Sequence, residues 1–511
     1  MAPSPVCDDE SHDERSPLLS RPDDDDYTAT TTSEITRSKR LTVIGLCFGL
    51  MMLLEIGLVL ISTPLLEVQE DILCRRRYPA PLGEDPDCKD KNVQGELASL
   101  QSWLIVLDLV PGLAVAVPYG LVAERQGRTL VLGLSLLGIT LSYLFNAVVC
   151  SLPTVLPLRL IWISFLFNFI GGGITVFSAM ILSIASDVST DEQRSTAFSY
   201  LGASMMIGAV LANPVTYWVM ELGGTWVSIY AGLGLMTVLT VAAFRFPETL
   251  QTTRHKGDDD AHQEDEDGNE NNMPKGGLQK LLEQSRAGVT RFSDFVRLLA
   301  TEERRVGLVL LSVVLTTFGR NAASILMQYV TARFNWSWSK AGLLTSVQSL
   351  VSLLLLTVLL PAAAQLLLLR GLGPRSKDLW LARASILLQV VGAFVTGLAH
   401  TPPLLILGIV ISALGFGYNL LVRGLMTSLL SHDIALLFSL IGFLETAGTV
   451  IATPLLTFAF RVGLDWGDSW LGLPFITAGV LFIGATAIVG SVSVGEVKKA
   501  VPEDGPDEAV V

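Results

Sequence analysis

Six ionisable side chains lie inside long apolar runs of this 511-residue chain, and they are the first places to look for chemistry. A charged group in the hydrocarbon of a membrane is costly unless it has a partner or lines a wet cavity, so such groups commonly mark the paths of ions and substrates. Three are acids and three are bases: Glu55, Asp108, Arg159, Arg320, Arg423 and Glu445. This set predicts the handling of ions and solutes.

The acids are candidates for proton exchange. Burial in hydrocarbon favours the neutral form of a carboxyl group, unless a nearby arginine holds it ionised. Glu55 has only apolar neighbours in the sequence, which predicts a proton or cation site that faces a cavity. The alternative is a structural glutamate that is hydrogen-bonded to a neighbouring helix.

The remaining charges are expected to form pairs or to meet substrate. We predict an ion pair between Asp108 and Arg159, which would serve either proton coupling or the specificity of helix packing. Glu445 and Arg423 stand in neighbouring apolar runs and are expected to neutralise each other. Arg320 is the candidate for contacting an anionic substrate group, because a guanidinium fork suits carboxylates and phosphates.

The elements that must position these residues are membrane helices, since 50% of the residues are hydrophobic and the mean hydropathy is +0.52. The formal net charge of -13 lies largely in acidic segments outside the apolar runs, which argues against a surface for nucleic acid. Twelve apolar runs are long enough to cross a bilayer as helices: 41–63, 97–121, 129–150, 157–184, 195–219, 225–246, 306–330, 341–369, 379–399, 403–430, 436–460 and 470–492.

The most specific motif of the chain lies in the short polar stretch between the second and third runs. It reads Gly-x-x-Ala-Glu-Arg-x-Gly-Arg and is formed by Gly120, Ala123, Glu124, Arg125, Gly127 and Arg128. The pattern resembles the loop between helices two and three of the major facilitator superfamily, in which an aspartate usually stands where this chain has Glu124. The resemblance implies an all-helical membrane protein with twelve transmembrane helices in two six-helix bundles, and a substrate bound between the bundles.

Other stretches resemble the same superfamily. Arg159 and the triple glycine at 171–173 are similar to its fourth-helix pattern. The loops that follow the first and fourth runs resemble those of fungal facilitators found beside secondary-metabolite genes. The fifth-helix signature of drug:proton antiporters is matched only in part, by Gly202, Gly208, Asn213 and Pro214.

This resemblance divides the chain into five parts. They are a disordered acidic segment (1–40), a six-helix bundle (41–246), an acidic linker (247–305) with an amphipathic helix expected at 278–300, a second bundle (306–493) and an acidic tail (494–511). An even number of spans places both termini on one side. The Lys and Arg residues of short loops gather on that side, which predicts that it is cytosolic, although the loop after the first run is also rich in basic residues.

Three short patterns concern processing and location. Cys74 and Cys88 share one hydrophilic loop, so they form a disulfide if it faces an oxidising compartment and remain free thiols otherwise. Asn335 begins an N-glycosylation sequon so close to the membrane that we expect it to be unmodified. An acidic dileucine sorting signal, with plain linker as the alternative, is formed by Glu14, Leu18 and Leu19.

Enzyme motifs are not found in the sequence, which has no P-loop, no His-Glu-x-x-His and no nucleophile elbow. The five histidines form no ligand cluster along the sequence, so we expect neither a metal nor another cofactor. Energy must then come from an ion gradient. The expected partners are a small-molecule substrate, protons and the lipid bilayer, without nucleic acid, and the chain is expected to be monomeric.

These features predict a secondary active transporter that works by alternating access and exports a small organic solute in exchange for protons. The resemblance to fungal facilitators favours a secondary metabolite or toxin as the substrate. Proton-coupled uptake of a nutrient is the alternative within transport, and a non-transporting membrane sensor is the alternative from another class. The plasma membrane is the common location of the family, whereas the dileucine pattern favours a vacuole or endosome.

Overall fold

The computed structural model describes residues 37–78, 88–189, 191–246, 304–429 and 434–491. Within these residues the regular secondary structure is helical, and 12 helical segments are long and apolar enough to cross a membrane. The predicted all-helical membrane fold is therefore confirmed. Several predictions lie outside the described residues: the sorting signal at Glu14, Leu18 and Leu19, the amphipathic helix at 278–300 and the acidic tail.

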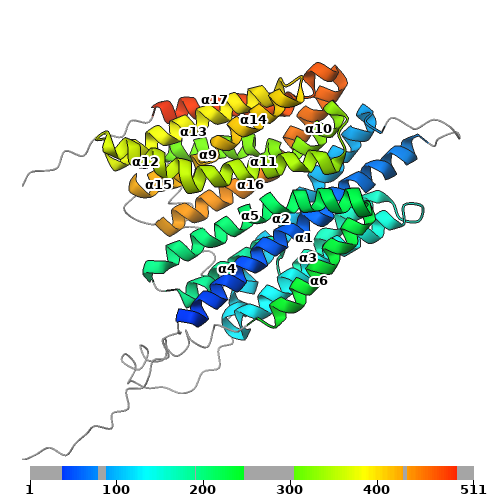
Figure 1. The fold of residues 1–511 in the computed structure, drawn as a ribbon, viewed down its shortest axis with the longest axis horizontal. Helices are drawn as coiled ribbons and strands as arrows, with labels where there is room; N and C mark the ends of the chain where they lie inside the picture. The colour runs from blue at the N-terminus through cyan, green and yellow to red at the C-terminus, as the bar shows by residue number, and fades with distance from the viewer. Residues whose placement is uncertain (1–36, 79–87, 190, 247–303, 430–433, 492–511) are drawn as a thin grey trace, which may run out of the picture.

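The first six spans pack together and form the lower group of helices in Figure 1. Helix α1 lies against α5 and α6, and α3 contacts α6 and both parts of the fourth span. The elements of this N-terminal group are α1 (Arg37–Arg77), α2 (Lys91–Gln126), α3 (Arg128–Ser151), η1 (Leu158–Phe169), α4 (Gly173–Val188), α5 (Asp191–Gly223) and α6 (Thr225–Phe244).

The second six spans form the upper, C-terminal group in Figure 1. Helix α13 packs against α14 and α17, and α9 packs against α16 and α17. The elements are α9 (Arg304–Arg320), η2 (Asn321–Ile325), α10 (Leu326–Phe334), α11 (Trp338–Leu354), the π-helical turn η3 (Leu355–Leu359), α12 (Leu360–Leu369), α13 (Pro374–Gly397), α14 (Pro402–Leu414), α15 (Tyr418–Leu429), α16 (Ile434–Trp466), η4 (Asp468–Trp470) and α17 (Leu473–Ser491).

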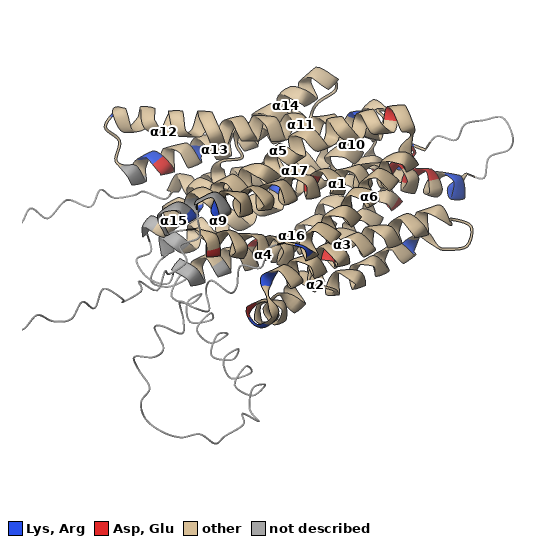
Figure 2. Cartoon of the chain, turned by 60° about the horizontal axis from the view of Figure 1, so that its bottom comes forward, with Lys and Arg blue, Asp and Glu red and all other residues tan. Residues whose placement is uncertain are grey.

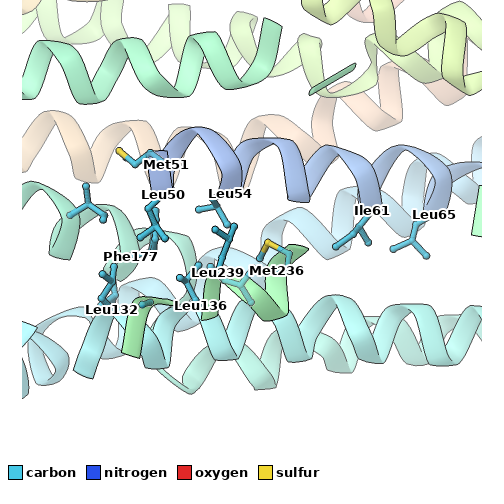
Figure 3. Packing of buried hydrophobic residues seen from close by; sticks show 14 of the residues in the cluster. Leu50, Met51, Leu54, Ile61, Leu65, Leu132, Leu136, Phe177, Met236 and Leu239 are labelled. Carbon is cyan, nitrogen blue, oxygen red and sulfur yellow. The ribbon is translucent and has the colours of Figure 1, made fainter. Parts of the chain in front are cut away.

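The core of the N-terminal group lies where α1, α3, α4 and α6 meet (Figure 3). Leu54 of α1, Leu136 of α3, Phe177 of α4 and Met236 of α6 are each at most 2% exposed. Lipid tails are as apolar as these side chains, so helices in a bilayer associate through close packing and polar contacts more than through the hydrophobic effect. Tight packing of this kind fixes the helices that carry the charged residues.

Small residues allow α1 and α6 to approach each other closely. A Cβ atom at Gly232 would lie 2.5 Å from Cγ1 of Ile61, so no larger residue fits without movement. Nearby, Ser228 Oγ donates a hydrogen bond to the carbonyl oxygen of Leu60 at 2.9 Å. Both features are typical of helix contacts within membranes.

The first helix extends well beyond the predicted end at residue 63. It continues through Pro64 to Arg77, because residues 65–77 contain no glycine and no further proline. Cys74 of this extension is bonded to Cys88, with an S–S distance of 2.03 Å. We call this end of the molecule the disulfide end, and the opposite end, with the loop 120–128, the motif end.

The fourth span is broken in the middle, whereas the sequence predicted a continuous helix. The 3-10 helix η1 ends at Phe169, and α4 begins at Gly173. Gly171 and Gly172 between them have φ values of 90° and 79°, a left-handed backbone that glycine adopts without steric cost. A Cβ atom at Gly171 would also lie 2.3 Å from the backbone of Leu134, so the break is tied to close packing on α3.

Charged residues lie mainly toward the ends of the spans, and few of them are found along the middle of the helices (Figure 2). This distribution follows from the cost of carrying charge into hydrocarbon. The few charges that remain inside the spans are therefore the natural starting point for a functional site.

Candidate functional site

The broken fourth span places Asn168 beside Asp108 of α2. Asn168 Nδ2 donates to Asp108 Oδ1 at 3.2 Å, whereas Asn168 Oδ1 is buried and has no hydrogen-bond partner. Asn168 is 8% exposed, while Asp108 stays accessible, as exchange of a proton requires. An amide has both a donor and an acceptor, so Asn168 can serve the ionised and, after rotation, the protonated form of Asp108.

Arg159 does not pair with Asp108, and this prediction was wrong. Its Nη2 lies 3.7 Å from Oε1 of Glu96 at the disulfide end, and its side chain is 72% exposed. The reason is position along the spans. Arg159 is the second residue of η1, whereas Asp108 lies 17 residues into α2, about 26 Å from the start of that helix at a rise of about 1.5 Å per residue. Arg159 therefore does not belong to the buried charges.

Glu55 of α1 and Asp108 lie in the N-terminal group near Tyr143 of α3. The phenol of Tyr143 lies within electrostatic reach of both carboxyl groups. Glu55 packs against Gly208 of α5. A Cβ atom at Gly208 would lie 2.9 Å from the Cβ atom of Glu55. In the part of the chain that the structure describes, no lysine, arginine or histidine forms an ion pair with either acid. Both can therefore change their charge without breaking a salt bridge.

In the C-terminal group, Glu445 of α16 lies between two arginines. Arg423 Nη2 of α15 is 2.6 Å from Glu445 Oε2, the pairing that the sequence predicted. Arg320, the last residue of α9, brings its Nη2 to within 3.7 Å of Glu445 Oε1. Asn419 completes the cluster, because in the amide orientation that satisfies its neighbours its oxygen accepts from Arg320 Nη1 and Nη2 at 2.7 and 2.6 Å.

A cavity of about 230 Å³ lies within the C-terminal group, next to Arg320. Its other walls are mainly apolar and aromatic, with Phe416, Phe475 and Phe482 among them, and Gln389 adds an amide. A small apolar cavity with one charged group at its wall is the usual form of a small-molecule site.

A buried polar network joins the two groups of helices at the disulfide end, and the sequence did not indicate it. Glu70 on the extension of α1 accepts from Lys89 Nζ at 2.7 and 2.8 Å and from Gln94 Nε2 of α2. Its Oε2 also accepts from Trp338 Nε1 of α11, at 2.7 Å. We call Glu70, Lys89, Gln94 and Trp338 the latch. The disulfide from Cys74 holds the segment that carries Lys89.

Further contacts between the two groups surround the latch. They are Gln328 Nε2 to the carbonyl oxygen of Gln94 at 2.7 Å, Arg461 Nη1 to Ser99 Oγ at 3.3 Å, Lys91 Nζ to Asp465 Oδ1 at 3.7 Å and Ser339 Oγ to Glu221 Oε1 at 3.1 Å. In Figure 1 the end of α1 and the start of α2 meet the second group near α10, at the right. The two groups are thus closed on each other at the disulfide end.

The contacts between the two groups that are named above lie toward the disulfide end. Toward the same end, a Cβ atom at Gly342 of α11 would lie 3.0 Å from Oδ1 of Asn213 of α5. Toward the motif end, a Cβ atom at Gly202 of α5 or at Gly442 of α16 would meet no atom within 4 Å. The named contacts are therefore distributed asymmetrically between the two ends.

The loop motif is held by an ion pair between Arg128 and Asp187, at the end of α4. The distance from Arg128 Nη1 to Asp187 Oδ2 is 2.9 Å, and both side chains are largely buried. Gly127, with φ of 110°, makes the turn between α2 and α3. Glu124 and Arg125 are exposed, so they are not part of this pair.

Asn335 is exposed and left-handed, with φ of 52°, directly before α11. The serine of its sequon, Ser337, is the N-cap of α11 and accepts from the backbone N–H of Lys340 at 3.4 Å. Whether Asn335 carries a glycan stays a prediction. Among the described residues there is no group of His, Cys, Asp and Glu that could hold a metal ion.

The model of the Major Facilitator Superfamily matches residues 93–453. The chain belongs to this family: it is a multi-pass membrane transporter of small molecules. The resemblance inferred from the loop motif is therefore confirmed. The match spans most of both helix groups, including Asp108, Glu445 and all three arginines discussed above.

Along nearly its whole length the chain is similar to fungal transporters. It is 31% identical over 507 residues to the MFS efflux pump atnC of Emericella nidulans, covering 96% of this chain and 95% of that protein. It is 28% identical to the efflux pump ustT of Aspergillus flavus, covering 85% and 84%. Among solved structures, a D-xylose–proton symporter matches with a TM-score of 0.56 at 16% identity, over 88% of this chain and 97% of that one, which shows the shared fold.

Proposed function

We propose that this transporter exports a small organic solute, a secondary metabolite or toxin, by alternating access and in exchange for protons. The observation that carries the proposal is the latch, which closes the two groups on each other at one end of the molecule. A transporter that exposes one central site to each side in turn requires a state that is closed at one end.

The motif end is proposed to face the cytosol. Arg125, Arg128, Arg194, Arg370 and Lys377 lie in or beside short loops at that end, and basic residues in short loops favour the cytosolic side. Both termini are then proposed to be cytosolic, and the protein is proposed to be a monomer of the plasma membrane. This orientation also places the disulfide in an oxidising compartment, where such bonds persist.

The direction and the class of solute rest on the relatives. Two of the proteins similar to this chain along most of their length are named efflux pumps, and both come from filamentous fungi. Export of this kind would remove a product that the cell itself makes. We propose the same role for this chain.

Proton exchange is assigned to Asp108 and Glu55. An ionised carboxylate is costly to enclose in a closed, dry transporter, so each acid must take up a proton or stay in contact with water when the motif end closes. After the solute has left, these acids would bind a proton from the outside and release it to the cytosol. This proton transfer would return the empty protein to the state that accepts solute.

The test compares cells that carry the gene, cells that lack it and cells in which it is restored. Metabolites inside and outside the cells are measured by mass spectrometry, with and without a protonophore. We expect at least one metabolite to be retained several-fold in the cells without the gene, and to be released again on restoration unless the proton gradient is collapsed. Unchanged distributions, or a lower internal content without the gene, would contradict export.

A further inference from the structure

We propose that the C-terminal group of helices binds a small amphipathic organic monoanion, with Arg320 holding the anionic group and the adjoining cavity holding the apolar body. The proposal rests on the export function above, because the anion is taken to be the exported solute. It adds the chemical class of that solute and the residues that select it.

The first argument is the balance of charge. Two guanidinium groups, Arg320 and Arg423, share the single carboxylate of Glu445, so the cluster has a formal charge of +1 (two positive charges and one negative). Within the described part of the C-terminal group, Glu445 is the only acid between the span ends. A second negative charge is therefore missing from the protein itself, and a bound anion would supply it.

The second argument is the donors that have no acceptor. Nε of Arg320 and Nε of Arg423 are both buried and lack hydrogen-bond partners. A buried donor without a partner is costly, and hydrogen bonds to a charged group are among the strongest available in proteins. An oxygen of a carboxylate or a phenolate beside Arg320 would remove that cost.

The third argument is the shape and lining of the cavity. It has a volume of about 230 Å³ and reaches from Arg320 to Phe475 and Phe482. An apolar cavity of about 150 Å³ can hold benzene, so this one has room for an aromatic ring with a short chain. Gln389 in the wall has a buried Oε1 without a partner, which can accept from a hydroxyl group on the ligand.

A monoanion fits this arrangement better than the alternatives. The second negative charge of a dianion would be repelled by the carboxylate of Glu445. A cation would be repelled by the net positive charge of the cluster. A neutral solute without an acceptor beside Arg320 would leave the Nε donor of Arg320 unsatisfied. The selection is therefore electrostatic, and it can be tested with compounds of one shape and different charge.

The experiment measures equilibrium binding to the full-length protein purified in detergent, with no ion gradient. The probe is 3-phenylpropanoate, compared with 3-phenylpropanamide and 3-phenylpropylammonium by isothermal titration calorimetry. We expect the carboxylate to bind about tenfold or more tightly than either analogue, since a charge-assisted hydrogen bond is worth about that factor. Equal binding of the three compounds would overturn the proposal.

Three variants locate the binding. Arg320→Gln should lose about tenfold in affinity for 3-phenylpropanoate, whereas Arg370→Gln, an exposed arginine after α12, should leave it unchanged. Glu445→Gln should bind the carboxylate more tightly, because it removes the competing negative charge. Weaker binding in folded Glu445→Gln would contradict an anion site, and so would unchanged binding in Arg320→Gln. Either result is sufficient if the other variant does not fold.

The outcomes separate this inference from the export function. If metabolite export fails in cells while the carboxylate binds selectively, the export proposal falls and the anion site stands. If export is gradient-driven but the carboxylate binds no better than the amide, the anion site alone is wrong.

Discussion

The two helix groups carry their buried charges in different ways. In the N-terminal group, Asp108 and Glu55 have no basic partner among the described residues, and a neutral amide, Asn168, is the hydrogen-bond partner of Asp108. In the C-terminal group, the one central acid, Glu445, lies between two arginines. The acids of the N-terminal helices can therefore change their charge without breaking an ion pair, whereas the charges of the C-terminal cluster are held together with a net charge of +1.

This division suits exchange of a proton for a solute. Glu445 makes two charged contacts, and a change in its charge would break both of them. Glu445 is therefore poorly suited to carry a proton. An acid without a cationic partner is free to gain and lose its proton as water reaches it and leaves.

The largest effect is expected from a substitution that removes an unpaired acid of the N-terminal group. Asp108→Asn removes the ionisable group but keeps the hydrogen bond with Asn168. In proteoliposomes, we expect accumulation driven by a pH gradient to fall to the level of empty liposomes, while exchange of labelled for unlabelled solute continues. The measurement is uptake of the exported metabolite with and without the gradient.

Two matched variants sharpen the result. Glu96→Gln changes an exposed carboxylate on the same helix and should leave the dependence on pH unaltered. Glu445→Gln should change solute affinity but keep the drive by the gradient. Survival of normal pH dependence in Asp108→Asn would show that the proton is carried elsewhere.

A smaller effect is expected at the latch that joins the two groups. Trp338→Phe keeps an aromatic side chain but removes the N–H that donates to Glu70. The loss should cost about 1.5 kcal/mol and shift the balance of states about tenfold toward opening at the disulfide end. The readout is the labelling rate of a cysteine placed at position 346, measured with a membrane-impermeant maleimide added from the disulfide side.

Trp336→Phe is the control for this prediction. Its ring packs near Phe334 in the same loop, and it donates to none of the latch residues in the described structure. Labelling that rises equally in both variants would mean that the loop, and not the hydrogen bond to Glu70, sets the balance.

The sequence predicted the fold and the family because both depend on local patterns. Long apolar runs require spanning helices, and the loop at 120–128 has a defined motif. The pairing of Glu445 with Arg423 was also predictable, since neighbouring spans carry them. The pairing of Asp108 with Arg159 was wrong because apolar length does not reveal how deep a residue lies within its span.

The remaining features depend on distant contacts or on backbone conformation. Glu70 and Trp338 are 268 residues apart in the sequence, so no local pattern links them. The break in the fourth span follows from left-handed glycines that could equally have served packing alone. Asn168 and Asn419 were overlooked because a search for charges passes over neutral amides.

The most direct test of the division between the two groups is infrared difference spectroscopy of the purified protein as pH is raised. The C=O band of protonated carboxyl groups should disappear with rising pH, and its amplitude should fall in Asp108→Asn and in Glu55→Gln but not in Glu445→Gln. A band that persists unchanged in Asp108→Asn and Glu55→Gln but is lost in Glu445→Gln would contradict the account. The acid that binds the proton would then lie in the C-terminal group and not in the N-terminal group.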